Sequence, residues 1–323
     1  MIIIGNLLLL FAGLGVFLIG MQLISYNMQN LAGNKISKML SRISNNKIAG
    51  IGLGAGAAAI LESSSATTVI LLGLVNAGIV NLLQATLIIM GANIGTTFTV
   101  ILLSFSYLPI GEFLAFLTLV GASIIMSCKT EKTRSVGFFI SGIGLIFAGI
   151  QIMSAGISFL KDSPSFTNFI GSINNPFVLL IVGLFVSGIV QSGTAITGIA
   201  ITMCEANIMP VVAAFYIILG SNIGTCATAM IASIGTQINT KRTALIHLLF
   251  NLIGVILFLP LLFMFGKRAI ASLTTNYSAS VLIAFFHIIF NIVTTIILMP
   301  FAKEIAALSK FIIRAPKNAP NNI

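Results

Sequence analysis

The sequence ESSSATT at residues 62–68 returns in altered form, as QSGTAIT, at residues 191–197. Each Ser/Thr cluster stands near the centre of a long apolar segment, residues 48–78 in the first case and 177–204 in the second. Each arm of such a segment has roughly 12 to 15 residues, whereas a helix needs about 20 apolar residues to cross a bilayer. We therefore predict two re-entrant hairpins, each of which turns inside the membrane at its cluster and returns to its own side.

A second pair of polar sequences follows the first. GANIGTT at 91–97 and GSNIGTC at 220–226 interrupt the apolar segments 82–105 and 210–234. Both segments are long enough to span a membrane, but glycine weakens a helix interior. We predict two broken transmembrane helices, with backbone carbonyl groups freed at the breaks.

All four sequences belong to one internal repeat with an offset of 129 residues. The same offset aligns further glycine and polar residues: Gly13, Gly20, Gln22, Ser25 and Gly54 fall on Gly142, Gly149, Gln151, Ser154 and Gly183. Such matches inside apolar segments indicate a duplication rather than a shared composition. The predicted organisation is repeat 1 over residues 1–128, repeat 2 over 129–257, and a last transmembrane helix with a short basic cytoplasmic tail over 258–323.

Seven transmembrane spans are expected, two of them the broken helices. The other five are residues 3–25, 110–127, 136–159, 243–265 and 279–300. Residues 27–46 are of mixed polarity, and we expect them to lie along the membrane interface. The predicted fold class is an all-α membrane protein with two inverted structural repeats.

The composition excludes the main classes of soluble protein. Of the 323 residues, 58% are hydrophobic and 7% are charged, whereas a soluble domain has about 25% charged residues. The net charge of +10 comes from short basic clusters between apolar segments, as in cytoplasmic loops of membrane proteins. We therefore expect no nucleic-acid partner.

The two copies are predicted to have opposite orientations in the membrane. The loop after the first span carries four basic residues, Lys35, Lys38, Arg42 and Lys47, whereas its counterpart at 160–176 holds Lys161 offset by Asp162. The positive-inside rule places the first loop in the cytoplasm and leaves the second free to lie outside. Lys267 and Arg268 would lie outside, against the rule.

Inverted repeats with discontinuous helices are typical of secondary transporters, which bind their cargo near the membrane midplane. The hairpin tips could meet there, and the N-terminus of each returning helix would attract a small oxyanion. Neither hairpin nor broken helix carries Lys or Arg, so a bound cation would have to supply the positive charge. A simpler interpretation is that the Ser and Thr hydroxyls only bond the backbone one turn back. The occurrence of four polar clusters in two pairs with the same offset favours a binding site over this interpretation.

The sequence resembles the sodium/phosphate cotransporter family (type II). The clusters at 62–68 and 191–197 are similar to its paired QSSS signatures, and the boxes HLLFN at 247–251 and HIIFN at 287–291 match bacterial members. The resemblance implies sodium-driven phosphate transport by alternating access in a multi-pass protein of the bacterial inner membrane, with no cofactor beyond the coupling ion. It implies phosphate contacts from Ser63, Ser64, Ser65, Gln191, Ser192, Gly193 and Thr194. Na⁺ contacts are expected from Glu62, Thr67, Asn93, Thr96, Thr97, Thr197, Asn222 and Thr225.

Two positions depart from the family pattern. Glu62 stands where the family usually has Gln, and Gly193 removes a hydroxyl. A carboxylate at membrane depth is costly and would repel an anion. We expect Glu62 either to be protonated and imitate Gln, or to be ionised and hold a cation.

The two histidines, His247 and His287, each share a helix face with an Asn four residues later. We expect them to form hydrogen bonds between packed helices and to have no role in transport. Bacterial relatives often carry a regulatory domain of the PhoU type; the tail here is too short for one, so a regulator of this type would be a separate protein.

Several alternatives remain open at this stage. The altered motifs could select another oxyanion or a small carboxylate, coupled to sodium or protons. An intramembrane serine hydrolase would use Ser63 or Ser192 as its nucleophile with a histidine base, although no GxSxG-like sequence is present. A passive channel and a homodimeric assembly are also left open.

Overall fold

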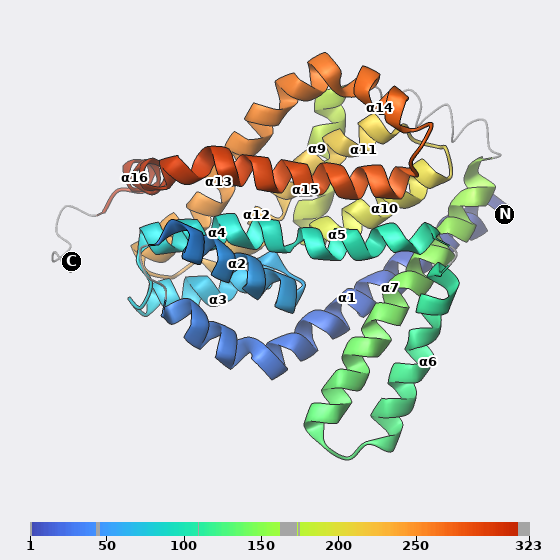
Figure 1. The fold of residues 1–323 in the computed structure, drawn as a ribbon, viewed down its shortest axis with the longest axis horizontal. Helices are drawn as coiled ribbons and strands as arrows, with labels where there is room; N and C mark the ends of the chain where they lie inside the picture. The colour runs from blue at the N-terminus through green and yellow to red at the C-terminus, as the bar shows by residue number, and fades with distance from the viewer. Residues whose placement is uncertain (1, 43–45, 109, 162–172, 174, 316–323) are drawn as a thin grey trace.

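The computed structural model describes residues 2–42, 46–108, 110–161, 173 and 175–315, and its regular structure in these residues is helical (Figure 1). The loop residues 162–172, with Asp162, and the tail residue Lys317 lie outside the described residues. The helices of the first half are α1 (Ile2–Ser41), α2 (Lys47–Leu61), α3 (Ser64–Asn76), α4 (Leu82–Gly95), α5 (Thr97–Ser104) and α6 (Gly111–Ser127). The second half contains α7 (Glu131–Lys161), α9 (Pro176–Val190), α10 (Gly193–Glu205), α11 (Val211–Gly224), α12 (Cys226–Ala232), α13 (Ile238–Leu261), α14 (Lys267–Leu273), α15 (Ala279–Leu298) and α16 (Ala302–Ile312).

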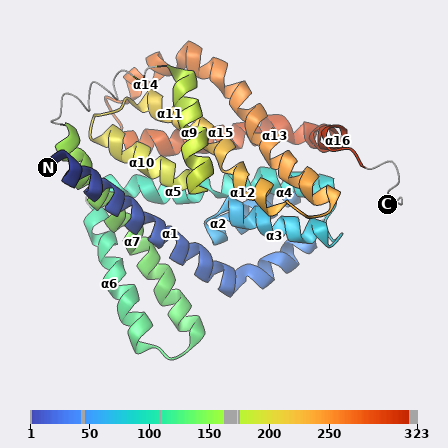
Figure 2. The same ribbon diagram turned by 180° about the vertical axis from the view of Figure 1, so that it is seen from behind.

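Six helical stretches among the described residues are long and apolar enough to cross a membrane. They are Ile4–Ser41, Leu82–Tyr107, Glu131–Ile157, Val211–Ala232, Ile238–Gly266 and Ala279–Ile312. The seventh predicted span corresponds to α6, which has 17 residues. At 1.5 Å per residue α6 is about 25 Å long, somewhat short of a hydrocarbon core of about 30 Å. Figure 2 shows α6 and α7 as an antiparallel pair that projects from the other helices.

The predicted first span and most of the segment at 27–46 form one helix, while the placement of that segment along the membrane interface stays a prediction. Helix α1 continues without a break from the predicted first span to Ser41, and Figure 1 shows it as one long curved helix. The residues that suggested an interface, such as Asn27 and Gln29, bond within the helix to Leu23 and Ser25. A polar residue that bonds one turn back does not interrupt a helix. Helix α1 therefore extends well beyond the apolar segment 3–25.

The predicted broken helices are interrupted at a single residue each. Thr96 separates α4 from α5, and Thr225 separates α11 from α12, but both keep right-handed helical dihedral angles. Their N–H groups still donate to the carbonyls of Ala92 and Ser221, at 3.2 and 3.0 Å. Each interruption is therefore a local irregularity in a run of helix, because glycine weakens a helix without ending it, and the expectation that it frees backbone carbonyls stays a prediction.

Each Ser/Thr cluster begins at the turn between two short helices and continues into the second of them, as the pattern of apolar arms predicts. The first helix of each pair ends at a residue with left-handed backbone, Glu62 (φ 49°) and Gln191 (φ 55°). The second begins after a serine N-cap, Ser63 or Ser192. Helices α2 and α9 also begin alike, since Asn46 and its repeat equivalent Asn175 are their N-caps.

Glycines allow the first helix of each pair to lie directly against the following long helix. A Cβ at Gly54, Gly91 or Gly95 would overlap the carbonyl oxygen of Ile88, Ile51 or Ala55, and a Cβ at Gly183, Gly220 or Gly224 that of Ile217, Leu180 or Leu184. Every contact in the second set is the first shifted by 129 residues. The α2–α4 packing and the α9–α11 packing are therefore the same.

Helices α1 and α7, the first of each half, cross through glycines in a reciprocal pattern. A Cβ on Gly13 would meet Gly149, and one on Gly20 would meet Gly142. Positions rise along one helix as they fall along the other, so the helices are antiparallel. Since Gly142 and Gly149 are the repeat equivalents of Gly13 and Gly20, each helix offers the other the same surface, as in a contact with two-fold symmetry.

Helix α15 packs against both halves of the molecule, touching α4 and α5 on one side and α10 and α11 on the other. Its ring Phe286 stacks on Phe215 of α11, with centroids 3.9 Å apart. The buried Phe290 of α15 meets Phe258 of α13 edge to face at 5.0 Å. Helix α13 runs on to Leu261, so the boundary drawn at residue 257 falls inside a helix.

Candidate functional site

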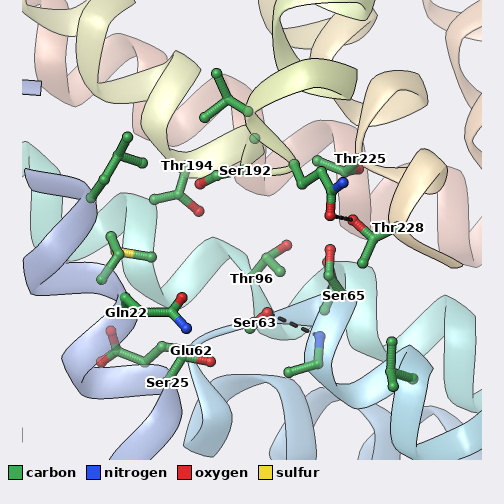
Figure 3. Close-up of a pocket in the computed structure, with 18 of the residues that line it drawn as sticks. Gln22, Ser25, Glu62, Ser63, Ser65, Thr96, Ser192, Thr194, Thr225 and Thr228 are labelled. Atoms are coloured by element: carbon green, nitrogen blue, oxygen red, sulfur yellow. Dashed lines mark hydrogen bonds between the residues drawn. The ribbon is translucent and has the colours of Figure 1, made fainter. Parts of the chain in front are cut away.

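The two Ser/Thr clusters lie on one cavity of about 720 Å³. Figure 3 shows Ser192 and Thr194 on one side of the open space and Ser63 and Ser65 on the other, with Thr96 between them. The polar and titratable lining residues are Gln22, Ser25, Gln29, Glu62, Ser63, Ser64, Ser65, Thr96, Gln191, Ser192, Thr194, Asn222, Thr225, Thr228 and His287. All seven residues predicted to contact phosphate, including Gly193, are part of this wall.

The turn before each returning helix directs that helix's N-terminus at the cavity. The hydroxyl oxygen of Ser63 accepts from the N–H of Ala66 at 3.0 Å, and that of Ser192 accepts from Ala195 at 3.2 Å. The first turn of a helix has four N–H groups without intrahelical partners, and a serine cap satisfies one of them. The other first-turn N–H groups of α3 and α10 are available to an anion, and the positive ends of two helix dipoles face the same space.

Glu62 is enclosed in the wall and has a relative exposure of 3%. Its Oε2 atom has no hydrogen-bond partner within the described part of the chain. Figure 3 shows Gln22 and Ser25 of α1 beside it. The repeat equivalent, Gln191, accepts a long bond of 3.4 Å from Thr228. A buried carboxylate oxygen without a donor is costly unless it is protonated or a cation binds it.

The helix irregularities also reach the cavity, through Thr96, Asn222 and Thr225. The two threonine hydroxyls donate to the carbonyls of Asn93 and Asn222, at 2.7 and 2.9 Å. A hydroxyl that donates to the backbone still has lone pairs with which to bind a cation. These oxygen atoms, together with those of the serines and Gln22, are suitable ligands for Na⁺.

Four residues predicted to bind Na⁺ are absent from this lining: Thr67, Asn93, Thr97 and Thr197. Each is buried and donates to a backbone carbonyl three or four residues earlier, at distances of 2.7 to 3.0 Å. These bonds are the backbone contacts expected of polar residues in membrane helices. Helix rotation turns these side chains away from the cavity, and their role in ion binding stays a prediction.

Sequence reasoning missed five polar residues of the lining: Gln22, Ser25, Gln29, Thr228 and His287. The first two belong to repeat-matched pairs, so the register already contained a signal for them. Their copies differ in use, because Gln151 donates to the carbonyl of Ser106 at 3.3 Å. Equivalent residues of the two repeats therefore differ in position: Gln22 lines the cavity, whereas Gln151 bonds to the backbone elsewhere.

The expectation of hydrogen bonds between packed helices is met by Asn251, whose amide donates to Cys226 of α12 at 3.3 Å, and is wrong for the two imidazole rings. The bonds of His287 are made with Asn291 on its own helix, and among the described residues His247 has no side-chain partner. Neither histidine therefore links two helices by a hydrogen bond. A His and an Asn four residues apart on one helix can hydrogen-bond to each other. Such a bond within the helix competes with hydrogen bonds to a neighbouring helix.

A second cavity of about 1140 Å³ lies between α9, α11 and the α13–α15 connection. Its wall is largely apolar, with Glu205 as its acidic residue. Glu205 already accepts a bond of 2.7 Å from the N–H of Ser280. The lining of this second cavity contains none of the predicted site residues, so the cavity of about 720 Å³ is the candidate site.

Comparisons with known proteins identify relatives of this chain. The chain is 27% identical over 285 residues to the uncharacterised protein YqeW of Bacillus subtilis, covering 88% of this chain and 91% of that one. It is 26% identical over 312 residues to the putative inorganic phosphate export protein YjbB of Salmonella typhimurium, covering 96% of this chain and 56% of YjbB, so it spans just over half of that relative. A shorter stretch of 95 residues, 28% of this chain and 15% of the relative, is 36% identical to the sodium-dependent phosphate transport protein 2A of Ovis aries.

No solved structure matches the chain. The family model for the Na⁺/Pi-cotransporter matches residues 16–155 and 163–299. These two segments include both Ser/Thr clusters, both helix irregularities and the cavity-lining part of α15. The chain therefore belongs to the Na⁺/Pi-cotransporter family.

Proposed function

We propose that this protein moves inorganic phosphate across the membrane, coupled to Na⁺, by alternating access of the cavity between the two Ser/Thr clusters. The observation that carries the proposal is the meeting of two helix N-termini and their serines on one cavity. The protein is a multi-pass membrane protein, and its family, YjbB and the transport protein 2A are by name phosphate transporters rather than enzymes. The hydrolase alternative is therefore dropped.

Phosphate would be held by neutral donors. The serine and threonine hydroxyls and the free first-turn N–H groups of α3 and α10 can each donate to a phosphate oxygen. No Lys or Arg is part of the described cavity wall. The anion therefore gains hydrogen bonds and dipole stabilisation from the protein but no full positive charge.

Sodium would supply that charge. The carboxylate of Glu62, the hydroxyls of Thr96 and Thr225 and the side chain of Gln22 offer oxygens around the cavity. A cation bound among them would stabilise both the buried carboxylate and the phosphate. Each ligand then raises the affinity for the other, which is the thermodynamic basis of coupled transport.

Alternating access would use the relation between the two halves. The reciprocal antiparallel crossing of α1 and α7 supports a two-fold axis in the membrane plane, and hence inverted repeats whose hairpins enter from opposite sides. Movement of the hairpin pairs against the other helices would expose the cavity to each side in turn. The direction of net transport would follow the combined gradients of Na⁺ and phosphate.

The test is uptake of radiolabelled phosphate into proteoliposomes, with and without an inward Na⁺ gradient. We expect uptake to require Na⁺ and to fall strongly in the Ser63→Ala, Ser192→Ala double variant. The matched control is Ser123→Ala on α6, an exposed serine that donates to Leu119, which should transport normally. Uptake that is equal with K⁺ in place of Na⁺ would disprove the coupling.

Competition in the same vesicles tests the cargo. Excess sulfate, arsenate or a dicarboxylate is added to the labelled phosphate. We expect arsenate, which has the shape and protonation of phosphate, to compete best. Stronger competition by a dicarboxylate would contradict phosphate as the cargo.

A further inference from the structure

His287 is the lining residue that comes from outside the two predicted repeats. It lies in the middle of α15, the helix that packs against both halves of the molecule. It is almost fully buried, with 6% exposure, and contributes surface to the cavity. Among the described lining residues it and Glu62 are the two with ionisable side chains.

The bonds of Asn291 determine which imidazole nitrogen carries the proton. Its Nδ2 atom lies 2.8 Å from the carbonyl oxygen of His287 and 3.3 Å from His287 Nδ1. An atom so close to a carbonyl oxygen must be the amide nitrogen, because an amide oxygen there would be repelled. An amide nitrogen can only donate, so in its 3.3 Å contact with Nδ1 the imidazole nitrogen accepts, and the proton of a neutral ring resides on Nε2.

A second His–Asn pair with the same spacing lies on α13, and neither of its residues lines the cavity. His247 and Asn251 have the spacing of His287 and Asn291, but both nitrogens of His247 are enclosed without a partner among the described residues. The amide of Asn251 donates to its own helix, at 3.1 Å, and to the sulfur of Cys226, at 3.3 Å. The two boxes are alike in sequence, and only the one on α15 reaches the cavity.

We propose that His287 is a phosphate-binding residue, whose neutral imidazole donates from Nε2–H to a phosphate oxygen, and that Asn291 is the positioning residue that holds it in this tautomer. The inference rests on the proposed function of the cavity. The ring edge that carries Nε2 is opposite the edge bound to Asn291. Unlike both nitrogens of His247, Nε2 of His287 is not among the described atoms that are fully enclosed without a partner, so it is the nitrogen that can face the cavity. A neutral donor adds a directed bond without adding charge, so the dependence on a cation is preserved.

The chain contains two histidines, which makes a direct spectroscopic test possible. Protein with ¹⁵N-labelled histidine and the substitution His247→Gln reports on His287 alone. We expect nitrogen shifts of the Nε2–H tautomer in nanodiscs with Na⁺, and a shift of the Nε2 resonance as inorganic phosphate is added. An Nδ1–H tautomer, or a spectrum that does not respond to phosphate, would overturn the proposal.

Transport kinetics provide the second measurement. We expect His287→Phe to raise KM for phosphate about tenfold or more, the effect of losing one bond to a charged ligand. The change should fall on KM more than on the maximal rate. His287→Gln, which keeps an N–H donor, should recover part of the affinity. Asn291→Leu should raise KM less, and in the ¹⁵N spectrum it should mix the two tautomers.

His247→Phe and Asn251→Leu are the matched controls, and both should keep the KM of the natural sequence. If the natural protein transports phosphate but His287→Phe leaves KM unchanged, the histidine proposal fails and the proposed function stands. If the natural protein transports no phosphate, both fail.

Discussion

At the scale of single residues, Glu62 and Gln191 occupy a backbone conformation that glycine adopts more easily. Both have positive φ at the end of a short helix, where glycine is the common choice. A side chain kept at such a position, at the same place in both halves, indicates that the side chain is needed. Both line the cavity.

Gln191→Gly should therefore separate stability from function. We expect the variant to be as stable as the natural protein or more stable, by up to about 1 kcal/mol, and to lose most phosphate uptake. Thermal unfolding in detergent and vesicle uptake measure the two effects. Asn207→Gly is the matched control, because Asn207 also has positive φ (59°) but lies outside the candidate site. Normal uptake by Gln191→Gly would show that its side chain is dispensable.

Glu62→Gln tests the charge in the wall. The amide keeps the shape and an oxygen ligand but can neither ionise nor carry a proton. We expect the Na⁺ concentration needed for half-maximal uptake to rise about tenfold, equivalent to about 1.4 kcal/mol of lost cation binding, and the pH dependence of uptake to flatten. Both are read from initial rates at several Na⁺ concentrations and pH values. If neither changes, Glu62 is not a cation or proton site.

At the scale of elements, glycines determine how closely helices approach. Gly54 and Gly183 bring α2 and α9 against the backbones of α4 and α11. Other glycines of α2, such as Gly52 and Gly56, would meet nothing within 4 Å if they carried a Cβ. Glycines that look equal in the sequence thus have different packing roles.

Gly54→Ala should destabilise the protein, by about 1 to 3 kcal/mol as for other overpacked sites, because the new methyl group overlaps the carbonyl of Ile88. Gly183→Ala should behave alike, since its methyl meets Ile217 in the same way. The control Gly52→Ala should be neutral or stabilising, since alanine favours helix by up to about 1 kcal/mol. Unfolding temperatures in detergent give the comparison. Equal temperatures for Gly54→Ala and Gly52→Ala would contradict the close packing.

At the scale of the whole molecule, the arrangement of the two halves decides which side each hairpin faces. Ile48 and Phe177 are repeat equivalents at the starts of α2 and α9, and their side chains are 76% and 57% exposed. In inverted repeats these two positions lie on opposite sides of the membrane. In parallel repeats they would lie on the same side.

Ile48→Cys and Phe177→Cys distinguish these cases when Cys128, Cys204 and Cys226 are replaced by Ser. A membrane-impermeant maleimide is applied to sealed right-side-out vesicles, and then to vesicles opened with detergent. We expect the cysteine at position 177 to react from outside and the one at position 48 to react after opening, because the basic loop before it is cytoplasmic. Labelling of both from the same side would exclude inverted repeats and the transport cycle built on them.

The sequence by itself determined the helical class, the apolar segments, the duplication and the residues of both cavity-lining clusters. These properties depend on composition and short-range periodicity, which can be read along the chain. The end of α1, the persistence of helix through Thr96 and Thr225, and the inward-facing residues depend on helix rotation and crossing. Only the tertiary structure decided that Gln22 and His287 face the cavity while Thr67 and Asn93 bond the backbone, because a polar side chain in a membrane helix can do either, and the neighbouring helices determine which.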